Sequence, residues 1–457
     1  MCRILNGLIF YLLLISLKLN GSDDLLDGNT SLHWKQPYIT NLGELRIGFF
    51  SPYNTTVSTD EDVLNVVSQH LDASGLRLSS THIYESEAAK FKWKTGIMPA
   101  LLAMPNVKTL TFELGAPKDF FQNINQPESR AATSKISIFQ AYGFVAGSRI
   151  DLPNLLDGFQ ELNKLVLYSC DFDNLTPKLN LNVKNLRLWD CALKESNLSM
   201  LVSSLPNLES LRIAECIFWK KRAENFTDNT LDLLSKFNKL EELSVLTSHD
   251  TYFIPHDYPL TISPSVVDNL PPCSLEISDV GLASLNETMP QLRWLRLGKI
   301  PNIGDMSIFK LSDNLKILHL EGLSAKFTDE GFKHIINSLT ELESLTLGGY
   351  RATEIKKEFG WQNWYHIPIY CQISENAFKE CHNLKLKHLQ LLYCQNIDDN
   401  SLIDLINALP NIKILTLTNC PNVSESGLHT LRNLKPGIEI IVSNQTLERY
   451  RHYNMDD

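Results

Sequence analysis

The sequence of 457 residues has no excess of basic charge and no long uninterrupted apolar run. Its 52 Asp and Glu residues outnumber its 42 Lys and Arg residues, which gives a formal net charge of −10. Because an acidic chain repels a phosphate backbone unless its basic groups are gathered into one stripe, we do not expect nucleic acid as a partner. The longest apolar run, residues 4–17, is interrupted by Asn6 and Gly7 and is short for a bilayer. We therefore predict no transmembrane span.

Motifs for catalysis and cofactor binding are also missing. The sequence has no Gly-rich phosphate loop, no nucleophile elbow and no HExxH motif. A His-Asp pair occurs at 249–250 and again at 256–257, but no second cluster completes a metal site, so we interpret the stretch as a polar loop. We expect no enzyme activity, no catalytic residues, no metal and no cofactor. An enzyme hidden in the insertions described below is the weaker alternative.

Residues 1–21 have the outline of a secretory signal. Arg3 precedes the apolar run and Gly21-Ser22 supplies small residues at its end, although Lys18 departs from the pattern. Glycosylation sequons, which would suit export, begin at Asn29, Asn54, Asn174, Asn197, Asn225, Asn286, Asn422 and Asn444. A secreted or luminal protein with a cleaved signal and a cytoplasmic protein with an apolar N-terminal segment are both open alternatives.

A phrase of alternating apolar residues recurs along the chain. The copies that end in cysteine are residues 162–170, 183–191, 208–216, 386–394 and 412–420. Copies without the cysteine begin at Leu240, Leu292, Leu315 and Leu342, and weaker ones begin at Leu42 and Val107. The alternation is the period of a strand with one buried face and is too short for a helix. Each copy therefore predicts a short strand.

A second phrase follows several of these strands, at residues 226–231, 327–332, 397–402 and 423–428. Its Ser, Thr or Asp can cap a helix by accepting free amide hydrogens, and its apolar residues continue at steps of three and four. Pro-Asn pairs such as Pro206-Asn207 then end the helix before the next strand. The chain thus alternates strands with helices.

Strands spaced about 20 to 30 residues apart are typical of the leucine-rich repeat. Stacked repeats predict an α/β fold, a right-handed leucine-rich-repeat solenoid shaped like the ribonuclease-inhibitor horseshoe, with parallel strands on the concave face and helices on the convex face. We divide the chain into an apolar or signal segment at 1–21, irregular N-terminal repeats or a cap at 22–151, the leucine-rich-repeat domain at 152–442 and a tail at 443–457.

The two phrases resemble the cysteine-containing leucine-rich repeats of the F-box/leucine-rich-repeat family. The LxxLxLxxC phrase and the TDxGLxxL-like phrase carry the resemblance, which covers the chain well from about Leu152 onward. The resemblance implies substrate recruitment to a ubiquitin ligase and a ligase adaptor as a partner. Residues 1–45 do not supply a compact helical F-box with a Leu-Pro start, so the adaptor is an open question.

Five cysteines occupy one position of the repeat, separated by two residues from the last inward apolar residue of the strand. They are Cys170, Cys191, Cys216, Cys394 and Cys420. We predict that they are buried free thiols, because a thiol there acts as a small hydrophobe and parallel side chains suit a disulfide poorly. Cys371 and Cys381 lie in an irregular segment and can pair if the protein is secreted.

The residue between the two inward leucines of each strand must face the concave side, because side chains alternate. These residues are Arg46, Thr111, Val166, Arg187, Arg212, Ser244, Arg296, His319, Thr346, Gln390 and Thr416. From this row and the position two residues further on, we predict a partner-binding surface made of Arg187, Arg212, Arg296, His319, Tyr168 and Trp189. Arginine and aromatic residues anchor interfaces, and the arginine fork fits carboxylates or phosphates. The alternative is that each side chain is merely solvated.

Three insertions, at 217–225, about 247–272 and about 350–378, follow a strand and precede its helix, which places them on one rim. They are rich in aromatic and basic residues that either pack back on the solenoid or meet a partner. The predicted rim contacts are Trp219, Lys221, Arg222, Tyr252, Tyr258, Trp361, Trp364 and Tyr365. The expected partner is a protein, bound through an acidic or phosphorylated segment.

Overall fold

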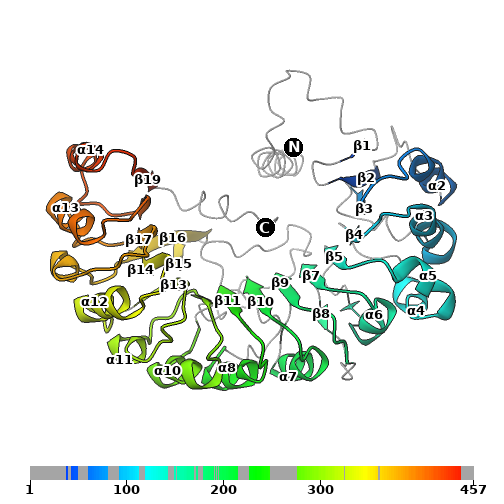
Figure 1. The fold of residues 1–457 in the computed structure, drawn as a ribbon, viewed down its shortest axis with the longest axis horizontal. Helices are drawn as coiled ribbons and strands as arrows, with labels where there is room; N and C mark the ends of the chain where they lie inside the picture. Colours follow the sequence, from blue (N-terminus) through cyan, green and yellow to red (C-terminus); the bar gives the residue numbers. More distant parts are fainter. Residues whose placement is uncertain are drawn as a thin grey trace.

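The chain forms a curved solenoid with strands along its inner side and helices along its outer side (Figure 1). The computed structural model describes residues 38–39, 43–49, 60–80, 92–112, 119–142, 149–150, 152–168, 171–172, 179–189, 191, 193, 195–214, 226–246, 275–323, 325–358 and 361–443. None of the described helices is long and apolar enough to cross a membrane.

One sheet of 15 strands runs the length of the curve, and its strands follow the order of the chain. Its strands are β1 (Tyr38–Ile39), β2 (Glu44–Phe49), β3 (Gly75–Ser80), β4 (Thr109–Phe112), β5 (Ile138–Tyr142), β7 (Lys164–Tyr168), β9 (Asn185–Trp189), β10 (Ser210–Ala214), β11 (Glu242–Leu246), β12 (Trp294–Leu297), β13 (Ile317–Glu321), β14 (Ser344–Gly348), β17 (His388–Leu392), β18 (Ile414–Thr418) and β19 (Glu439–Ser443). β1 is antiparallel to β2, and every later pair of neighbours is parallel. The predicted α/β repeat solenoid with an open parallel sheet is therefore confirmed.

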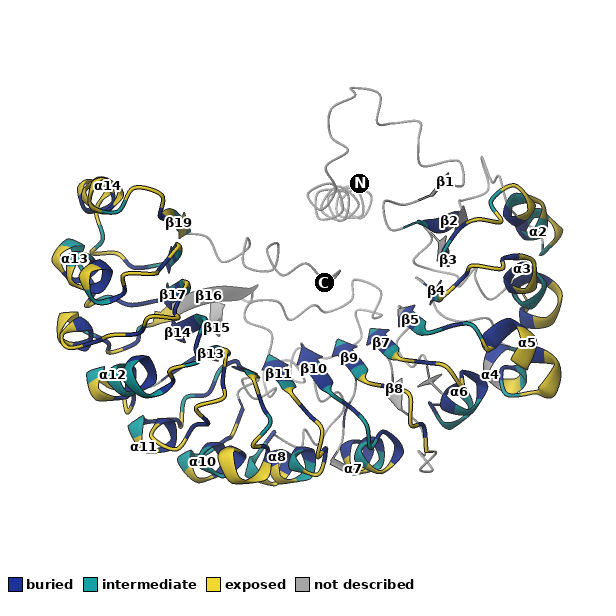
Figure 2. Ribbon diagram, in the orientation of Figure 1, coloured by how far each residue is buried: buried dark blue, intermediate teal, exposed yellow. Residues whose placement is uncertain are grey.

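Helices cover the other face of this sheet. They are α2 (Asp60–Ser68), α3 (Met98–Ala103), α4 (Phe120–Asn123), α5 (Arg130–Thr133), α6 (Leu152–Gly158), α7 (Glu195–Ser204), α8 (Asp228–Ser235), α10 (Asp279–Thr288), α11 (Asp305–Ile308), α12 (Asp329–Ser338), α13 (Asp399–Ala408) and α14 (Glu425–Leu434). Single turns of other helix types are η3 (Trp93–Ile97), η4 (Pro127–Ser129) and η5 (Glu375–Phe378). The helices bury one side against the sheet and expose the other (Figure 2).

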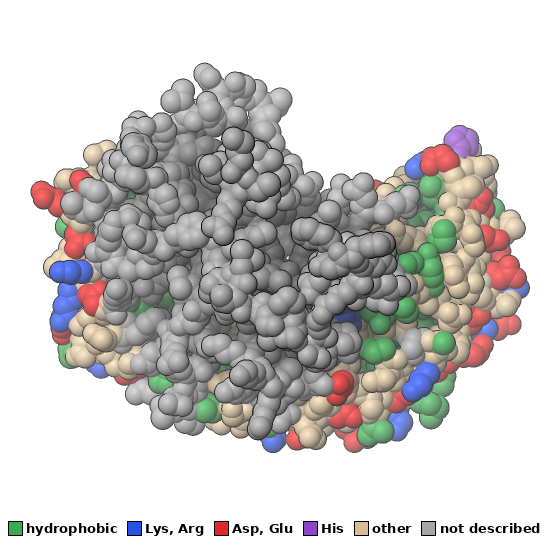
Figure 3. All heavy atoms as spheres, turned by 180° about the vertical axis from the view of Figure 1, so that it is seen from behind, with side chains coloured by type: hydrophobic (Ala, Val, Ile, Leu, Met, Phe, Trp, Pro, Cys, Tyr) green, Lys and Arg blue, Asp and Glu red, His purple; other side chains and the backbone are tan. Residues whose placement is uncertain are grey.

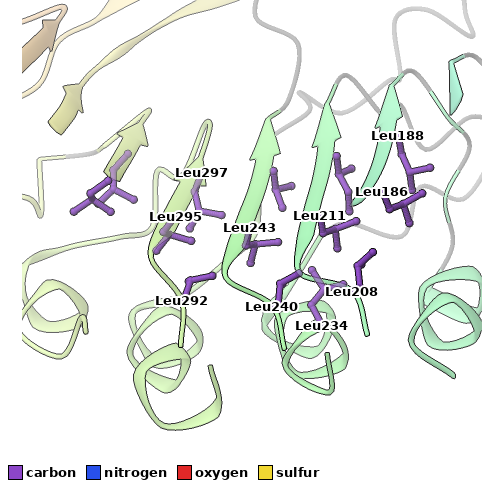
Figure 4. Close-up of a cluster of buried hydrophobic side chains, with 14 of the residues drawn as sticks. Leu186, Leu188, Leu208, Leu211, Leu234, Leu240, Leu243, Leu292, Leu295 and Leu297 are labelled. Carbon is purple, nitrogen blue, oxygen red and sulfur yellow. The ribbon is translucent and has the colours of Figure 1, made fainter. Parts of the chain in front are cut away.

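The core is a continuous layer between the sheet and the helices. In β9, Leu186 and Leu188 are buried while Arg187 between them is not, as the alternation predicts. Leucines of neighbouring repeats stack in rows between strand and helix (Figure 4). Burial of one leucine stabilises the fold by about 1.5–3 kcal/mol, so the repeated leucines hold the strands in register.

The sheet continues without a break through the N-terminal residues that the sequence assigns to irregular repeats or a cap. β3 and β5 belong to it, although neither was found as a repeat in the sequence. The core there is aromatic: Phe120 stacks on Phe139 with ring centroids 5.6 Å apart, and Trp93 meets Phe120 edge-on at 5.1 Å. β5 carries Phe139 and Ala141 at the inward positions, whereas β3 keeps Leu76 and Leu78 but has Ala73 in place of the first leucine of the phrase.

Hydrogen bonds join successive helices at the Ser, Thr and Asp residues that begin them. Asp305, the first residue of α11, accepts bonds from Thr328 N at 2.9 Å and Thr328 Oγ1 at 2.6 Å, and Thr328 in turn caps α12. A Cβ on Gly331 would lie 2.2 Å from Asp305 Oδ1, so only glycine leaves room for the carboxylate. Asp228, Asp329 and Asp399 make the same pair of bonds to Ser278, Ser374 and Ser424. We call this contact the aspartate staple.

The insertion after β14 begins with a two-stranded antiparallel hairpin, β15 (Tyr350–Glu358) and β16 (Trp361–Ile369). Its root is tight, because a Cβ on Gly348 would lie 1.9 Å from Leu392 O and one on Gly349 would lie 1.9 Å from Ile369 O. Gly348-Gly349 therefore allows a close approach of two backbones. The staple from Asp329 to Ser374 bridges the hairpin and keeps the flanking repeats in register.

The described cysteines are free and buried, as predicted for Cys191, Cys394 and Cys420. Cys191 Sγ, for example, lies 3.4 Å from Leu167 O of the preceding repeat. Cys371 forms no disulfide with Cys381. Its backbone instead forms an isolated parallel β-bridge with that of Cys394, because the chain after the hairpin returns beside the C-terminal end of β17. Cys170 and Cys216 lie outside the described residues.

Candidate binding surface on the concave face

The residues between the inward leucines form a single row across the sheet. The strand register aligns Arg77, Thr111, Gln140, Val166, Arg187, Arg212, Ser244, Arg296, His319, Thr346, Gln390, Thr416 and Ile441 in this order. We call it the central row. Because side chains alternate, residues two positions before it form a lower row on the same concave face, and those two positions after it form an upper row.

Arg212 on β10 is held from two sides. Its Nε donates to Glu242 Oε1 on β11 at 2.5 Å, and Ser210 Oγ donates to Glu242 Oε2 at 2.6 Å. Its guanidinium carbon lies 4.8 Å from the centre of the Trp294 ring on β12, a cation–π distance. The Arg212 side chain retains 25% of its exposure. This cluster joins three strands around one accessible cation.

Arg187 and the two predicted aromatic residues lie beside Arg212. Arg187 on β9 is the register partner of Arg212 and is half-buried. In the upper row, the rings of Tyr168 and Trp189 stack with centroids 6.1 Å apart and planes inclined by 29°. The structure thus brings four of the predicted residues into one patch on β7, β9 and β10.

The other two predicted concave residues are buried. Arg296 and His319 are register partners on β12 and β13, but they are only 9% and 7% exposed. His319 Nε2 lies 3.4 Å from Glu321 Oε2, which is also buried. These two side chains therefore offer little contact area to a partner.

The charges of the central strands differ from those of the whole chain. Concave-facing residues of β7, β9, β10, β11 and β12 include the cations Lys164, Arg187, Arg212 and Arg296 and a single carboxylate, Glu242. We call these strands the cationic segment. It carries a net of three positive charges within a chain of net charge −10. Around the outer, helical edge, by contrast, acidic and basic side chains are interspersed (Figure 3).

On β14, β17 and β18 the concave-facing residues carry no charged side chain apart from the titratable His388. On β14, β17 and β18, Thr346 Oγ1 donates to Gln390 Oε1 at 3.3 Å, and His388 bridges Ser344 at 3.3 Å and Thr416 at 3.5 Å. Burial lowers the pKa of His388, which keeps its ring neutral. We call these three strands the C-terminal arm.

The predicted rim residues are not placed beside this patch by the described structure. Trp219, Lys221, Arg222, Tyr252 and Tyr258 lie outside the described residues. Trp361, Trp364 and Tyr365 lie on β16, opposite Glu358, Ile355 and Glu354 of β15, and their side chains are outside the description. The rim contacts therefore stay predictions.

The sequence prediction missed Ser210, Glu242 and Trp294, which are all in the lower row. The signal that would have found them was present, because alternation places residue i−2 on the same face as residue i. Glu242 and Trp294 are also the first residues of their strands. Within the described residues, no group of three or more His, Cys, Asp or Glu side chains is arranged to hold a metal ion.

No protein-family model and no curated protein match this chain. Among solved structures, it is similar to one described as "Crystal structure of Rad7 and Elc1 complex in yeast", with 13% sequence identity and a TM-score of 0.39. The match covers 84% of this chain and 88% of that one. A likeness at this level carries no weight for function, and the class of the fold, a repeat solenoid with an open parallel sheet, rests on the strand register.

Proposed function

We propose that the chain is a non-enzymatic protein-interaction receptor that binds a protein partner on its concave face. The observation that carries the proposal is the patch around Arg212, where arginines and stacked aromatic rings lie together on a regular sheet. Arginine, tyrosine and tryptophan are the side chains that most often dominate binding energy at interfaces. Solenoids also offer an extended inner surface that suits a long segment of a partner.

The finer role that the sequence resemblance implies is recruitment of that partner to a ubiquitin ligase. The repeats support it only through their LxxLxLxxC and TDxGLxxL-like phrases. A ligase adaptor would bind elsewhere than the concave patch, so the two interactions are separable. Purified chain mixed with candidate adaptors tests the role, and the absence of any complex with an intact N-terminus contradicts it.

Comparative capture tests the receptor function. The wild-type chain and the double variant Arg187→Glu/Arg212→Glu are used to capture partners from cells, with Asp232→Lys/Glu425→Lys on the outer helices as the matched control. Both control side chains are exposed, at 72% and 82%. We expect a reproducible partner with wild type and control that is lost with the concave variant. Equal recovery with all three chains contradicts the proposal.

A secreted or luminal recognition protein of the same fold is the second candidate. Asn286, a sequon residue on α10, is exposed and available to carry a glycan, whereas Asn197 is buried and Asn422 Nδ2 donates to Gln395 O at 2.6 Å. N-terminal sequencing and a glycosidase shift of the chain expressed with a C-terminal tag test whether the protein is exported. An N-terminus near Ser22 together with a glycan that Asn286→Gln removes supports export. An intact N-terminus without glycan contradicts it.

A further inference from the structure

We propose that Arg212 anchors a subsite for a phosphorylated side chain of the protein partner. This inference rests on the proposed function and specifies the chemistry that the concave face recognises. Two features of Arg212 support it: the contacts that fix the guanidinium, and the guanidinium nitrogens that have no hydrogen-bond partner among the described residues.

The orientation of Arg212 is set before any ligand arrives. Arg212 Nε donates to one carboxylate oxygen of Glu242 at 2.5 Å, and Ser210 Oγ donates to the other oxygen at 2.6 Å. The guanidinium carbon of Arg212 lies 4.8 Å from the centre of the Trp294 ring. A free arginine side chain loses considerable rotamer entropy on binding, and a pre-oriented one loses less. The cluster therefore uses its contacts to position one cation.

Trp294 acts on Arg212 through its ring and not through its indole nitrogen. Its Nε1 is buried and makes no hydrogen bond within the part of the chain that the structure describes. The indole is the strongest of the aromatic platforms for a cation. Trp294→Phe therefore tests the platform alone, because it weakens the cation–π contact without removing a hydrogen bond.

The remaining guanidinium nitrogens of Arg212 are the candidate contact with a ligand. In the described part of the chain, Nε is the guanidinium nitrogen that has a hydrogen-bond partner, which leaves the Nη1 and Nη2 donors for a ligand. The side chain is 25% exposed. Two parallel N–H donors match two oxygens of a phosphoryl group or a carboxylate.

Charge favours the phosphoryl group over a carboxylate. The concave-facing residues of these strands include four cations and one carboxylate, Glu242, and a phosphorylated side chain carries about −1.5 to −2 at neutral pH. A carboxylate neutralises only one of those charges. Arg187 lies on the adjacent strand, about 4.8 Å away in the sheet, so it is near enough to add to the attraction.

The aromatic pair defines what accompanies the phosphoryl group. Tyr168 and Trp189 stand in the upper row, two residues beyond the central row, which is roughly 7 Å along the strands. Successive side chains of an extended peptide can reach both positions. We therefore infer that the recognised segment carries an apolar side chain within a residue or two of the phosphorylated one.

Arrayed peptides test this inference with the full chain as the probe. Each sequence is synthesised in three forms that differ only in phosphoserine, glutamate or serine at the centre, with leucine or alanine two residues away. We expect wild type to favour phosphoserine over serine by about tenfold, and Arg212→Lys to reduce the preference to about twofold because lysine lacks the fork. Trp294→Phe and Glu242→Gln should each give an intermediate preference, because each loosens Arg212 without removing it.

Arg77→Lys is the matched control. Arg77 is also in the central row, is 21% exposed and pairs with a glutamate, Glu44, at 3.0 Å, but it lies at the other end of the sheet. Its variant should keep the full preference. Thermal unfolding of every variant separates loss of recognition from loss of fold.

Several results would overturn the phosphoryl subsite. They are no binding of any peptide, equal binding of the three forms, equal preference for glutamate and phosphoserine, an unchanged preference in Arg212→Lys, or equal competition by a mixed-sequence single-stranded RNA. If peptides bind without regard to phosphorylation and Arg187→Glu/Arg212→Glu still weakens them, the receptor function stands and only the subsite fails. If no concave substitution changes binding, both proposals fail.

Discussion

The cationic segment and the C-terminal arm share one backbone and differ in the surface they present. Both repeat the same inward leucines, the same parallel register and the same helix caps. The concave side of one carries Lys164, Arg187, Arg212 and Arg296, while the other carries hydroxyl, amide and neutral imidazole groups. Neighbouring repeats can therefore vary their surface without altering their core.

The difference teaches that stability and recognition are carried by alternate residues of the same strand. The leucines at i and i+2 meet the helices, and the residue at i+1 is free to meet a partner. The following predictions test this division, because each compares matched positions in the two regions.

Core truncation should affect both regions equally. Leu243 on β11 and Leu415 on β18 are both completely buried and occupy the same position of the repeat. We expect Leu243→Ala and Leu415→Ala each to lower the free energy of unfolding by about 2–5 kcal/mol, measured by urea denaturation. Lys310→Ala, on an exposed residue, serves as the control and should change it by less than about 0.5 kcal/mol. A small effect at either leucine would show that the region has a different core.

Charge changes on the concave face should affect the two regions unequally. For a partner isolated with wild type, Arg187→Glu/Arg212→Glu should weaken binding by about 2 kcal/mol or more, because it removes anchors and adds repulsion. Gln390→Glu/Thr416→Glu in the C-terminal arm, at two half-buried positions of the central row, should weaken binding by less than about 0.5 kcal/mol. Titration calorimetry gives both values. Equal losses would mean that the C-terminal arm belongs to the same interface.

Breaking the aspartate staple should cost about the same beneath both regions. Gly281→Ala places a Cβ near Asp228, and Gly427→Ala places one near Asp399. We expect each to lower the free energy of unfolding by about 1–3 kcal/mol, through overpacking and the loss of buried hydrogen bonds. The double variant Asp228→Ala/Gly281→Ala should be less destabilised than the sum of its single variants, because the residues act as a pair. Strict additivity would contradict the staple.

The smallest effect is a pH dependence confined to the C-terminal arm. Burial lowers the pKa of His388 below its ordinary value of 6.5, so the folded state binds fewer protons than the unfolded state. The stability that neutral His388 contributes is present above pH 6.5 and is lost as the pH falls through the lowered pKa. His388→Gln should flatten the urea midpoint between pH 7.5 and 5.5, whereas His382→Gln, on an exposed residue, should not. An unchanged slope in His388→Gln would rule the mechanism out.

The buried thiols beside β17 of the C-terminal arm should be protected from alkylation. Burial raises the pKa of Cys381 to about 12, and the thiols of Cys371 and Cys420 together with burial raise that of Cys394. Thiolate is the reactive form, so we expect Cys381 and Cys394 to resist iodoacetamide at pH 8 until the chain unfolds. Mass spectrometry of native and urea-treated samples measures the extent of alkylation at each cysteine. Rapid labelling of the native chain would contradict the buried arrangement.

The sequence predicted the strands wherever the full leucine phrase is present, because burial imposes its period directly. It missed β5, where Phe139 and Ala141 replace the leucines, and β3, where Leu76 and Leu78 are present but Ala73 stands at the first position of the phrase. It predicted the central row, because alternation is a local property of each strand. It could not predict that Arg296 is buried while Arg212 is held by Glu242 and Trp294, because those contacts join residues 30 or more positions apart.

Site-specific photocross-linking tests the concave-face claim even while the partner is unidentified. A photoreactive phenylalanine analogue is placed at Asn185 or Gln390 on the inner sheet, and at Asp232 or Glu425 on the outer helices. We expect a discrete cross-linked protein from the inner positions, stronger at Asn185 beside Arg187, and none from the outer ones. Cross-links that arise from the outer helices alone would contradict the account.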